Sequence, residues 1–181
     1  MDEKKTSNFY WKKLPAESLS RDARKVEPRC AFLGIGNELN GDDAAGVWLS
    51  RRLLSLKISC DRLLFYDCGQ VPENALSALR KFRPDLVVLM DAADFGGVPG
   101  DVRWIDPQAT TGFSASSHTL PFSVLSKYLT KELGCEVRVL GIQPLSLEFD
   151  AGLSSPVKNT LALLIKDLEA WIKQECATKS P

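Results

Sequence analysis

The sequence has no long hydrophobic run. Its most apolar stretch, Leu86 to Met90, spans five residues, whereas a membrane-spanning helix needs about 20. The first residues, MDEKKTSNFYWKKLP, are charged and contain no apolar core of the kind found in secretory signals. We therefore expect a cytoplasmic protein without a membrane segment.

An excess of charge of either sign is also missing. The 181 residues include 23 Lys and Arg and 23 Asp and Glu, so the formal net charge is zero. Proteins that bind nucleic acids through a strongly basic surface show a different balance. We expect no nucleic-acid partner.

Cysteine pairs and histidines are scarce. The five cysteines, an odd number, contain no C-x-x-C pair, which favours reduced thiols over a disulfide framework. We interpret them as inert, and only Cys68 lies at the end of an expected strand. The chain has a single histidine, His118.

The remaining composition is typical of a folded domain. Apolar residues make up 44% and charged residues 25% of the chain. Residues 1–28 are charged and contain two prolines, and we predict a flexible arm there with a short helix near 17–25. We predict one domain at 29–176, a short tail at 177–181, and a monomer.

Apolar runs alternate with helical patterns along the domain. Strands are expected at 30–36, 62–66, 86–90, 101–105 and 136–142, and helices at 42–56, 72–82, 120–133 and 154–176. This alternation is typical of an α/β protein. We predict a twisted, mostly parallel five-stranded sheet with helices on both faces.

Polar side chains follow the expected strands. Asp42 and Asp43 follow the first strand, Asp67 the second and Asp91 the third, while His118 precedes a helix. Ligands of such sheets bind outside the carboxyl ends of the strands. We expect several acids and the histidine on one rim, although helix capping for Asp42 and structural roles for the others remain alternatives.

The glycine-rich turn after the first strand only partly fits a dinucleotide-binding motif. Gly34 and Gly36 are present, but Leu39 stands where the third glycine should be. Asp42 and Asp43 would also repel a pyrophosphate. A nucleotide site is therefore disfavoured, and we expect no organic cofactor.

Two carboxylates and an imidazole can form a three-ligand site for zinc or nickel. Asp43, Asp91 and His118 would supply these ligands, at separations of 48 and 27 residues with no local motif. Spacing alone leaves both a metal site and structural roles open.

Five sequence blocks, in order between about Cys30 and Trp171, resemble the hydrogenase maturation proteases. The blocks comprise Gly34, Gly36, Asn37, Gly41, Asp42, Asp43 and Gly46; then Asp67, Gly69, Pro72, Glu73 and Asn74; then Asp91 and Ala92; then His118 and Pro121; and last Gly141, Ile142, Gln143 and Pro144. The last block and the Pro-Glu-Asn segment are most similar to the branch that serves formate hydrogenlyase, hydrogenase 3. The typical member lacks residues 1–28 and often has glycine at the position of Cys68.

The resemblance implies an endopeptidase. Such enzymes remove the C-terminal extension of the [NiFe]-hydrogenase large-subunit precursor after nickel has been inserted. It also implies that Asp43, Asp91 and His118 form the catalytic site and contact the nickel that the substrate carries. Because a protonated imidazole cannot bind a metal, activity should then fall below about pH 6.

Several functional alternatives remain at this point. The metal could polarise the scissile carbonyl or activate a water, or an aspartate could act as general base. A non-catalytic nickel-dependent maturation chaperone, a nucleotide-binding enzyme and a peptidase for another precursor, such as a spore protease, are alternatives to the hydrogenase protease.

Overall fold

The sheet has five strands, four of them parallel. In the computed structural model, which describes residues 28–109 and 121–177, the strands are β1 (Cys30–Ile35), β2 (Leu63–Gly69), β3 (Leu86–Ala92), β4 (Val102–Ile105) and β5 (Glu136–Ile142). Their order is β2-β1-β3-β5-β4, and only β4 runs antiparallel to its neighbour. The predicted fold is confirmed.

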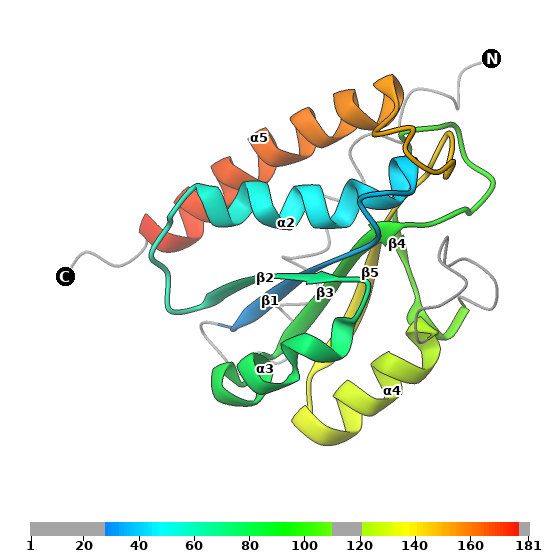
Figure 1. Ribbon diagram of the computed structural model, residues 1–181. Helices are drawn as coiled ribbons and strands as arrows, with labels where there is room; N and C mark the ends of the chain where they lie inside the picture. The colour runs from blue at the N-terminus through cyan, green and yellow to red at the C-terminus, as the bar shows by residue number, and fades with distance from the viewer. Residues whose placement is uncertain (1–27, 110–120, 178–181) are drawn as a thin grey trace, which may run out of the picture.

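Helices cover both faces of this sheet (Figure 1). The α-helices are α2 (Ala45–Ser55), α3 (Leu76–Phe82), α4 (Phe122–Leu133) and α5 (Ser155–Ala177). Three short 3-10 helices, η2 (Gly41–Ala44), η3 (Pro72–Ala75) and η4 (Pro107–Ala109), accompany them. α2 and α5 lie side by side over one face, and α3 and α4 lie over the other.

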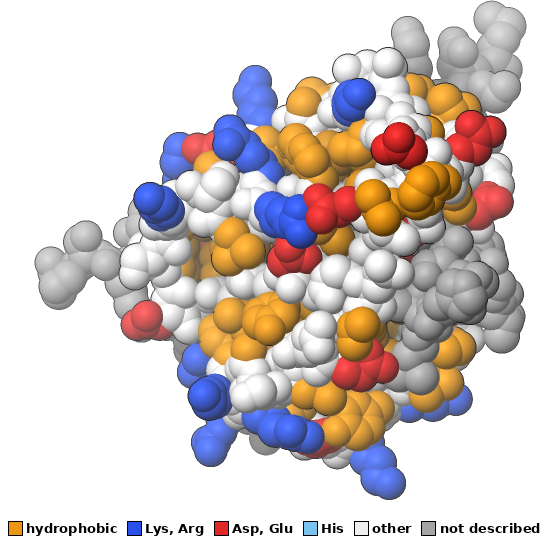
Figure 2. Space-filling view, in the orientation of Figure 1, with side chains coloured by type: hydrophobic (Ala, Val, Ile, Leu, Met, Phe, Trp, Pro, Cys, Tyr) orange, Lys and Arg blue, Asp and Glu red, His pale blue; other side chains and the backbone are white. Residues whose placement is uncertain are grey.

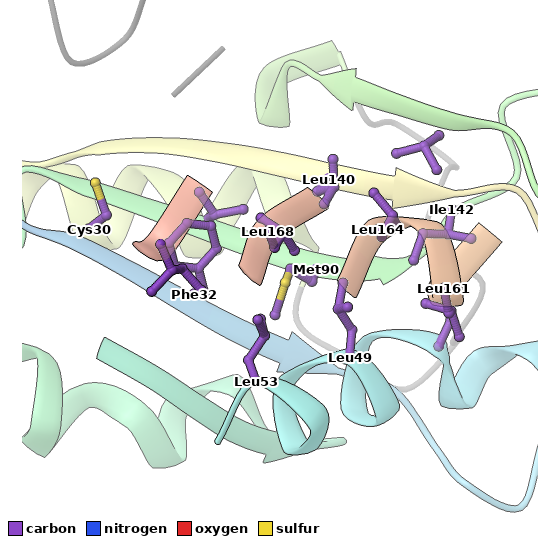
Figure 3. Close-up of a cluster of buried hydrophobic side chains, with 14 of the residues drawn as sticks. Cys30, Phe32, Leu49, Leu53, Met90, Leu140, Ile142, Leu161, Leu164 and Leu168 are labelled. Atoms are coloured by element: carbon purple, nitrogen blue, oxygen red, sulfur yellow. The ribbon is translucent and has the colours of Figure 1, made fainter. Parts of the chain in front are cut away.

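Successive side chains of β1 point to opposite faces of the sheet, which explains why the core consists of two apolar clusters. Phe32 points toward α2 and α5, whereas Ala31 and Leu33 join the cluster with α3 and α4. Successive strand residues face opposite sides, so a strand buried on both faces must be apolar throughout. Figure 3 shows the cluster between the sheet and helices α2 and α5. In it, Met90 of β3 and Leu140 of β5 lie near Leu49 of α2 and near Leu164 and Leu168 of α5.

Two element boundaries differ from the prediction in a way that affects the site. β2 and β3 continue past the predicted ends at Tyr66 and Met90, so Asp67 and Asp91 lie within strands instead of in the loops that follow. Hydrogen bonding to the neighbouring parallel strands extends the ladders over these polar residues. The first turns of the helices predicted at 42–56 and 72–82 are 3-10 turns.

Several predictions concern residues outside the described ranges. They include the arm except for Pro28, the C-terminal tail and the loop that contains His118. Within residues 28–109 and 121–177, no helix combines the length and apolarity needed to cross a bilayer.

Candidate active site

The chain reverses its direction of travel across the sheet between β1 and β3. From β1 it passes outward to the edge strand β2, and it then returns to place β3 on the other side of β1. Crevices at such a switch point, outside the carboxyl ends of the strands, are the usual ligand sites of open α/β sheets. Asp43 follows β1 and Asp91 lies near the end of β3, so both acids lie at this point.

Asp43 is fixed by the close approach of a helix to the sheet. It lies in η2, which leads directly into α2. A Cβ atom on Gly46 would lie 2.0 Å from the carbonyl oxygen of Met90 and 2.4 Å from that of Ile35. Only glycine therefore allows the start of α2 to contact β1 and β3, which places Asp43 beside the residue that follows Met90.

Gly36, in the turn after β1, lies close to both Asp43 and Asp91. Gly36 has a φ of +140°, a conformation that favours glycine. A Cβ atom there would lie 1.8 Å from the carbonyl oxygen of Asp43 and 3.7 Å from Oδ1 of Asp91. The second glycine of the turn after β1 therefore allows the backbone of Asp43 to pack directly against the turn, a role that its partial fit to a nucleotide motif did not indicate.

Both carboxylates are almost completely buried. Each is only 1% exposed, and burial raises the pKa of both. The negative charge of Asp43 raises the pKa of Asp91 further, so that it lies well above its usual value. For Asp43 a hydrogen bond from the backbone N–H of Asn37, 2.9 Å from Oδ2, partly offsets the effect of burial.

Three of the four carboxylate oxygens of this pair have no hydrogen-bond partner in the described part of the chain. They are Oδ1 of Asp43 and both oxygens of Asp91. Buried polar atoms in folded proteins are nearly always paired, because an unpaired one costs about 1–3 kcal/mol. Such oxygens are suited to bind a cation or to exchange a proton with a bound substrate.

The third predicted ligand, His118, lies outside the described residues. Among residues 28–109 and 121–177, no group of three or more His, Cys, Asp or Glu side chains is arranged to hold a metal ion. The structure thus brings Asp43 and Asp91 together, and the three-ligand site with His118 stays a prediction.

Asp42 does not cap a helix, so that interpretation is wrong. No side chain caps η2. Oδ2 of Asp42 instead accepts a hydrogen bond from the N–H of Leu145 at 2.8 Å, and Oδ1 accepts one from the N–H of Ser154 at 2.6 Å. A longer bond from the N–H of Ser146, 3.3 Å, completes the set. Asp42 therefore fastens the loop between β5 and α5 to the turn that contains Asp43.

Asp67 does not join the acidic pair either. Its Oδ2 atom accepts a hydrogen bond from Nε of Arg51 at 2.5 Å, and its Oδ1 atom accepts one from the N–H of Gly69 at 3.0 Å. Arg51 also pairs with Glu38. The expected rim of several acids is therefore reduced to Asp43 and Asp91 among the described residues, because Arg51 neutralises Asp67 on the strand.

Gln143 has a structural role that the sequence did not reveal. Its Oε1 atom accepts hydrogen bonds from the N–H groups of Phe95 and Gly97, both at 3.0 Å, and its Nε2 donates one to Asp94 at 3.0 Å. The side chain thereby holds the loop that follows Asp91. Its place in the last sequence block was the only signal, and the partners are 46 to 49 residues away.

Cys68 is not poised to act as a nucleophile. It is buried, and burial raises the pKa of its thiol to about 12. The thiolate, which is the reactive form, is therefore disfavoured at neutral pH. The five cysteines are free thiols, as predicted.

Comparison with known proteins places this chain in a family. The family model for hydrogenase maturation protease, HycI, matches residues 52–171. The hydrogenase 3 maturation protease of Escherichia coli K12 is 34% identical over 141 residues, which cover 77% of this chain and 88% of that protein.

Two solved structures share the fold. The crystal structure of a [NiFe] hydrogenase maturation protease HycI from Thermococcus kodakarensis KOD1 is 34% identical, with a TM-score of 0.72, and the match covers 84% of this chain and 97% of that one. The solution structure of the endopeptidase HycI from Escherichia coli is 32% identical, with a TM-score of 0.69, over 79% and 90% of the two chains. A buried pair of aspartates at the switch point thus lies in a chain that belongs to the hydrogenase maturation protease family.

Proposed function

We propose that this protein is the endopeptidase that removes the C-terminal extension of a [NiFe]-hydrogenase large-subunit precursor after nickel insertion. The observation that carries the proposal is the buried pair Asp43 and Asp91, with three carboxylate oxygens free to bind. Membership of the hydrogenase maturation protease family supports the reaction.

Nickel enters this proposal as part of the substrate. The precursor would present its nickel to Asp43 and Asp91, and His118 would complete the set of ligands. A cation beside the two carboxylates favours their ionised forms, so it would lower the raised pKa of Asp91 and release its proton. A nickel-free precursor offers no such compensation and would leave the acids unpaired. This difference in binding would make the enzyme select the loaded precursor.

The same two residues can take part in hydrolysis. An ionised carboxylate next to the scissile bond can accept a proton from the attacking water. Asp43, with its lesser pKa elevation and one backbone hydrogen bond, is better suited than Asp91 to be ionised at neutral pH. We assign Asp43 as the general base, with Asp91 facing it as the group that retains a proton until the cation binds.

Cleavage of a matched precursor tests this function. The purified protein is mixed with the large-subunit precursor encoded in the same genome, either nickel-loaded or nickel-free, and intact mass reports the C-terminal extension. We expect shortening of the loaded precursor only. Asp43→Asn, Asp91→Asn and His118→Ala should each lower the rate at least 100-fold, whereas Asp61→Asn, at an exposed acid, should leave it unchanged.

Each other result has a definite meaning. Shortening of both precursors would keep the protease and reject nickel-dependent selection. Binding of the loaded precursor without shortening would contradict the proposed function and favour the non-catalytic maturation chaperone.

A further inference from the structure

Exposed apolar side chains gather on two loops beside the acidic pair. We call Leu39, Leu145, Leu147 and Phe149 the apolar rim; these side chains are 55%, 58%, 36% and 74% exposed. In Figure 2, orange side chains lie next to acidic ones at the upper right, over the loops that follow β1 and β5. A cluster of large apolar side chains left in water commonly marks a surface that another molecule covers.

The two loops are joined to each other. The N–H of Asp150 donates a hydrogen bond to the carbonyl oxygen of Leu39 at 2.6 Å, and the N–H of Asp42 donates one to the carbonyl oxygen of Ser146 at 2.9 Å. A Cβ atom on Gly41 would lie 2.6 Å from that same oxygen, so the backbones are in direct contact. The rim is therefore one surface built from segments about 100 residues apart in the chain.

The rim is also rigidly tied to the candidate active site. The carboxylate of Asp42, 1% exposed, accepts the N–H groups of Leu145, Ser146 and Ser154. Asp43, the next residue, is a member of the acidic pair. A surface held in its binding conformation in advance loses less conformational entropy when a partner docks. A chain bound on the rim would thus lie close to the two carboxylates.

The charge of the loops restricts the partner. Glu148 and Asp150 are exposed on the loop after β5, and residues 143–157 contain no Lys or Arg. On the other loop, Glu38 is neutralised by Arg51. The rim is therefore apolar with a net negative charge, which complements a segment that combines apolar residues with Lys or Arg.

We propose that the apolar rim docks a stretch of the hydrogenase precursor next to the cleaved bond, apolar in character and with at least one basic residue. This inference rests on the proposed function, because it takes the precursor as the substrate. The rim would supply binding energy away from the reacting atoms, and its removal should raise KM more than it lowers kcat.

A double variant on the rim and a matched control test this role. Leu145→Ser with Phe149→Ser removes two rim side chains, whereas Val124→Ser with Leu163→Ser removes two exposed apolar side chains from α4 and α5. Affinity for the nickel-loaded precursor is measured by biolayer interferometry, and cleavage is followed by intact mass. We expect at least a tenfold rise in Kd and KM for the rim variant, with kcat within twofold and an unchanged Tm. The control variant should match the wild type.

The charge of the rim is tested separately. Glu148→Gln with Asp150→Asn should weaken binding at low salt and converge with the wild type in about 0.5 M salt, where screening removes the attraction. Asn is suited to position 150, because Asp150 has a φ of +61°. Equal affinities of this variant and the wild type at low salt would overturn the basic character of the partner segment.

The two proposals can fail separately. Wild-type cleavage with an unchanged Kd in the rim variant would overturn the docking role and keep the protease. Loss of binding in the rim variant, with no cleavage by the wild type, would keep the docking role and overturn the protease. A wild-type dimer that the rim substitutions dissociate, with precursor binding unchanged, would assign the rim to a second copy of the chain and overturn the inference.

Discussion

Three aspartates near the start of α2 and the end of β3 have the same side chain and different environments. Asp42 and Asp43 are adjacent and equally buried, yet the Asp42 carboxylate accepts three backbone N–H groups and the Asp43 carboxylate accepts one. Both carboxylate oxygens of Asp91 lack a partner among the described residues. Burial raises the pKa of Asp43 and of Asp91, the two acids with few or no hydrogen-bond donors. These environments separate a structural acid from two acids available for chemistry.

The raised pKa of Asp91 predicts a pH-dependent stability. The native state binds this proton more tightly than the unfolded chain, where the pKa lies near 3.8. The free energy of unfolding should therefore fall as the pH rises above about 4. Asp91→Asn replaces the ionisable group with a neutral amide, so the fall in stability caused by ionisation of Asp91 no longer occurs. We expect the variant to be about 1–3 kcal/mol more stable than the wild type at pH 8. Urea unfolding at pH 5 and pH 8 measures the difference, and a variant that is less stable at pH 8 would contradict the prediction.

Contacts between elements set the geometry of the site. α2 reaches the sheet through Gly46, and the loop between β5 and α5 is held by Asp42. The first contact brings Asp43 to Asp91, and the second brings the apolar rim to the same edge. Neither Gly46 nor Asp42 is easily replaced. Glycine is the one residue that lacks a Cβ atom, and a carboxylate can accept several N–H donors at once.

Gly46→Ala tests the helix contact. Alanine in place of glycine normally stabilises a helix by about 1 kcal/mol. At position 46 the added methyl would lie 2.0 Å from the carbonyl oxygen of Met90, so we expect a loss of about 1–3 kcal/mol and slower cleavage. Gly134→Ala adds a carbon that meets no neighbouring segment within 4 Å; alanine is strained there by the φ of +68°, so this variant should lose some stability and keep wild-type cleavage. A stabilised Gly46→Ala variant would show that α2 can move away from β3 without cost.

Asp42→Ala tests the loop contact. The substitution leaves the partly buried N–H groups of Leu145 and Ser154 without their acceptor, so we expect a loss of about 1–3 kcal/mol in the free energy of unfolding. Asp94→Ala, at an exposed aspartate that accepts one backbone N–H and one side-chain N–H, should cost less. Denaturant titration compares the two variants, and equal losses would argue against the special role of Asp42.

At the scale of the whole molecule, two apolar clusters share one sheet in the part of the chain that the structure describes. Cys30 belongs to the cluster under α2 and α5, and Cys68 and Cys135 belong to the cluster under α3 and α4. Burial raises the pKa of Cys30 and Cys68 to about 12 and that of Cys135 to about 11. These thiols are therefore unreactive while the protein is folded.

Thiol labelling tests whether the two clusters unfold together. The loss of either layer would disrupt every strand of the shared sheet. We therefore expect the labelling rates of Cys30, Cys68 and Cys135 with iodoacetamide to give the same free energy of opening. Peptide mass spectrometry after timed labelling gives the three rates. Faster labelling of Cys135 alone would show that the α4 layer opens independently.

The order of strands and helices was predictable because its causes are local. A strand such as β1 or β3 is a short, mainly apolar run followed by polar or glycine residues, and the α/β alternation follows from the order of such runs and the helical patterns between them. The family could also be identified from the sequence, because its blocks occur in one order with similar spacing. The ends of β2 and β3 were misplaced, since pairing with β1 and β5 extends both strands over polar residues.

The sequence by itself determined the fold class, the family and the choice of Asp43 and Asp91 as candidates, because local patterns and block order encode them. Only the tertiary structure decided which acids are available. The sequence offered helix capping for Asp42 and left the role of Asp67 as open as that of Asp91. Partners 103 and 16 residues away in the chain give both acids structural roles. The pKa of a carboxylate depends on its burial and its hydrogen-bond donors, and both are set by segments that meet only in the folded protein.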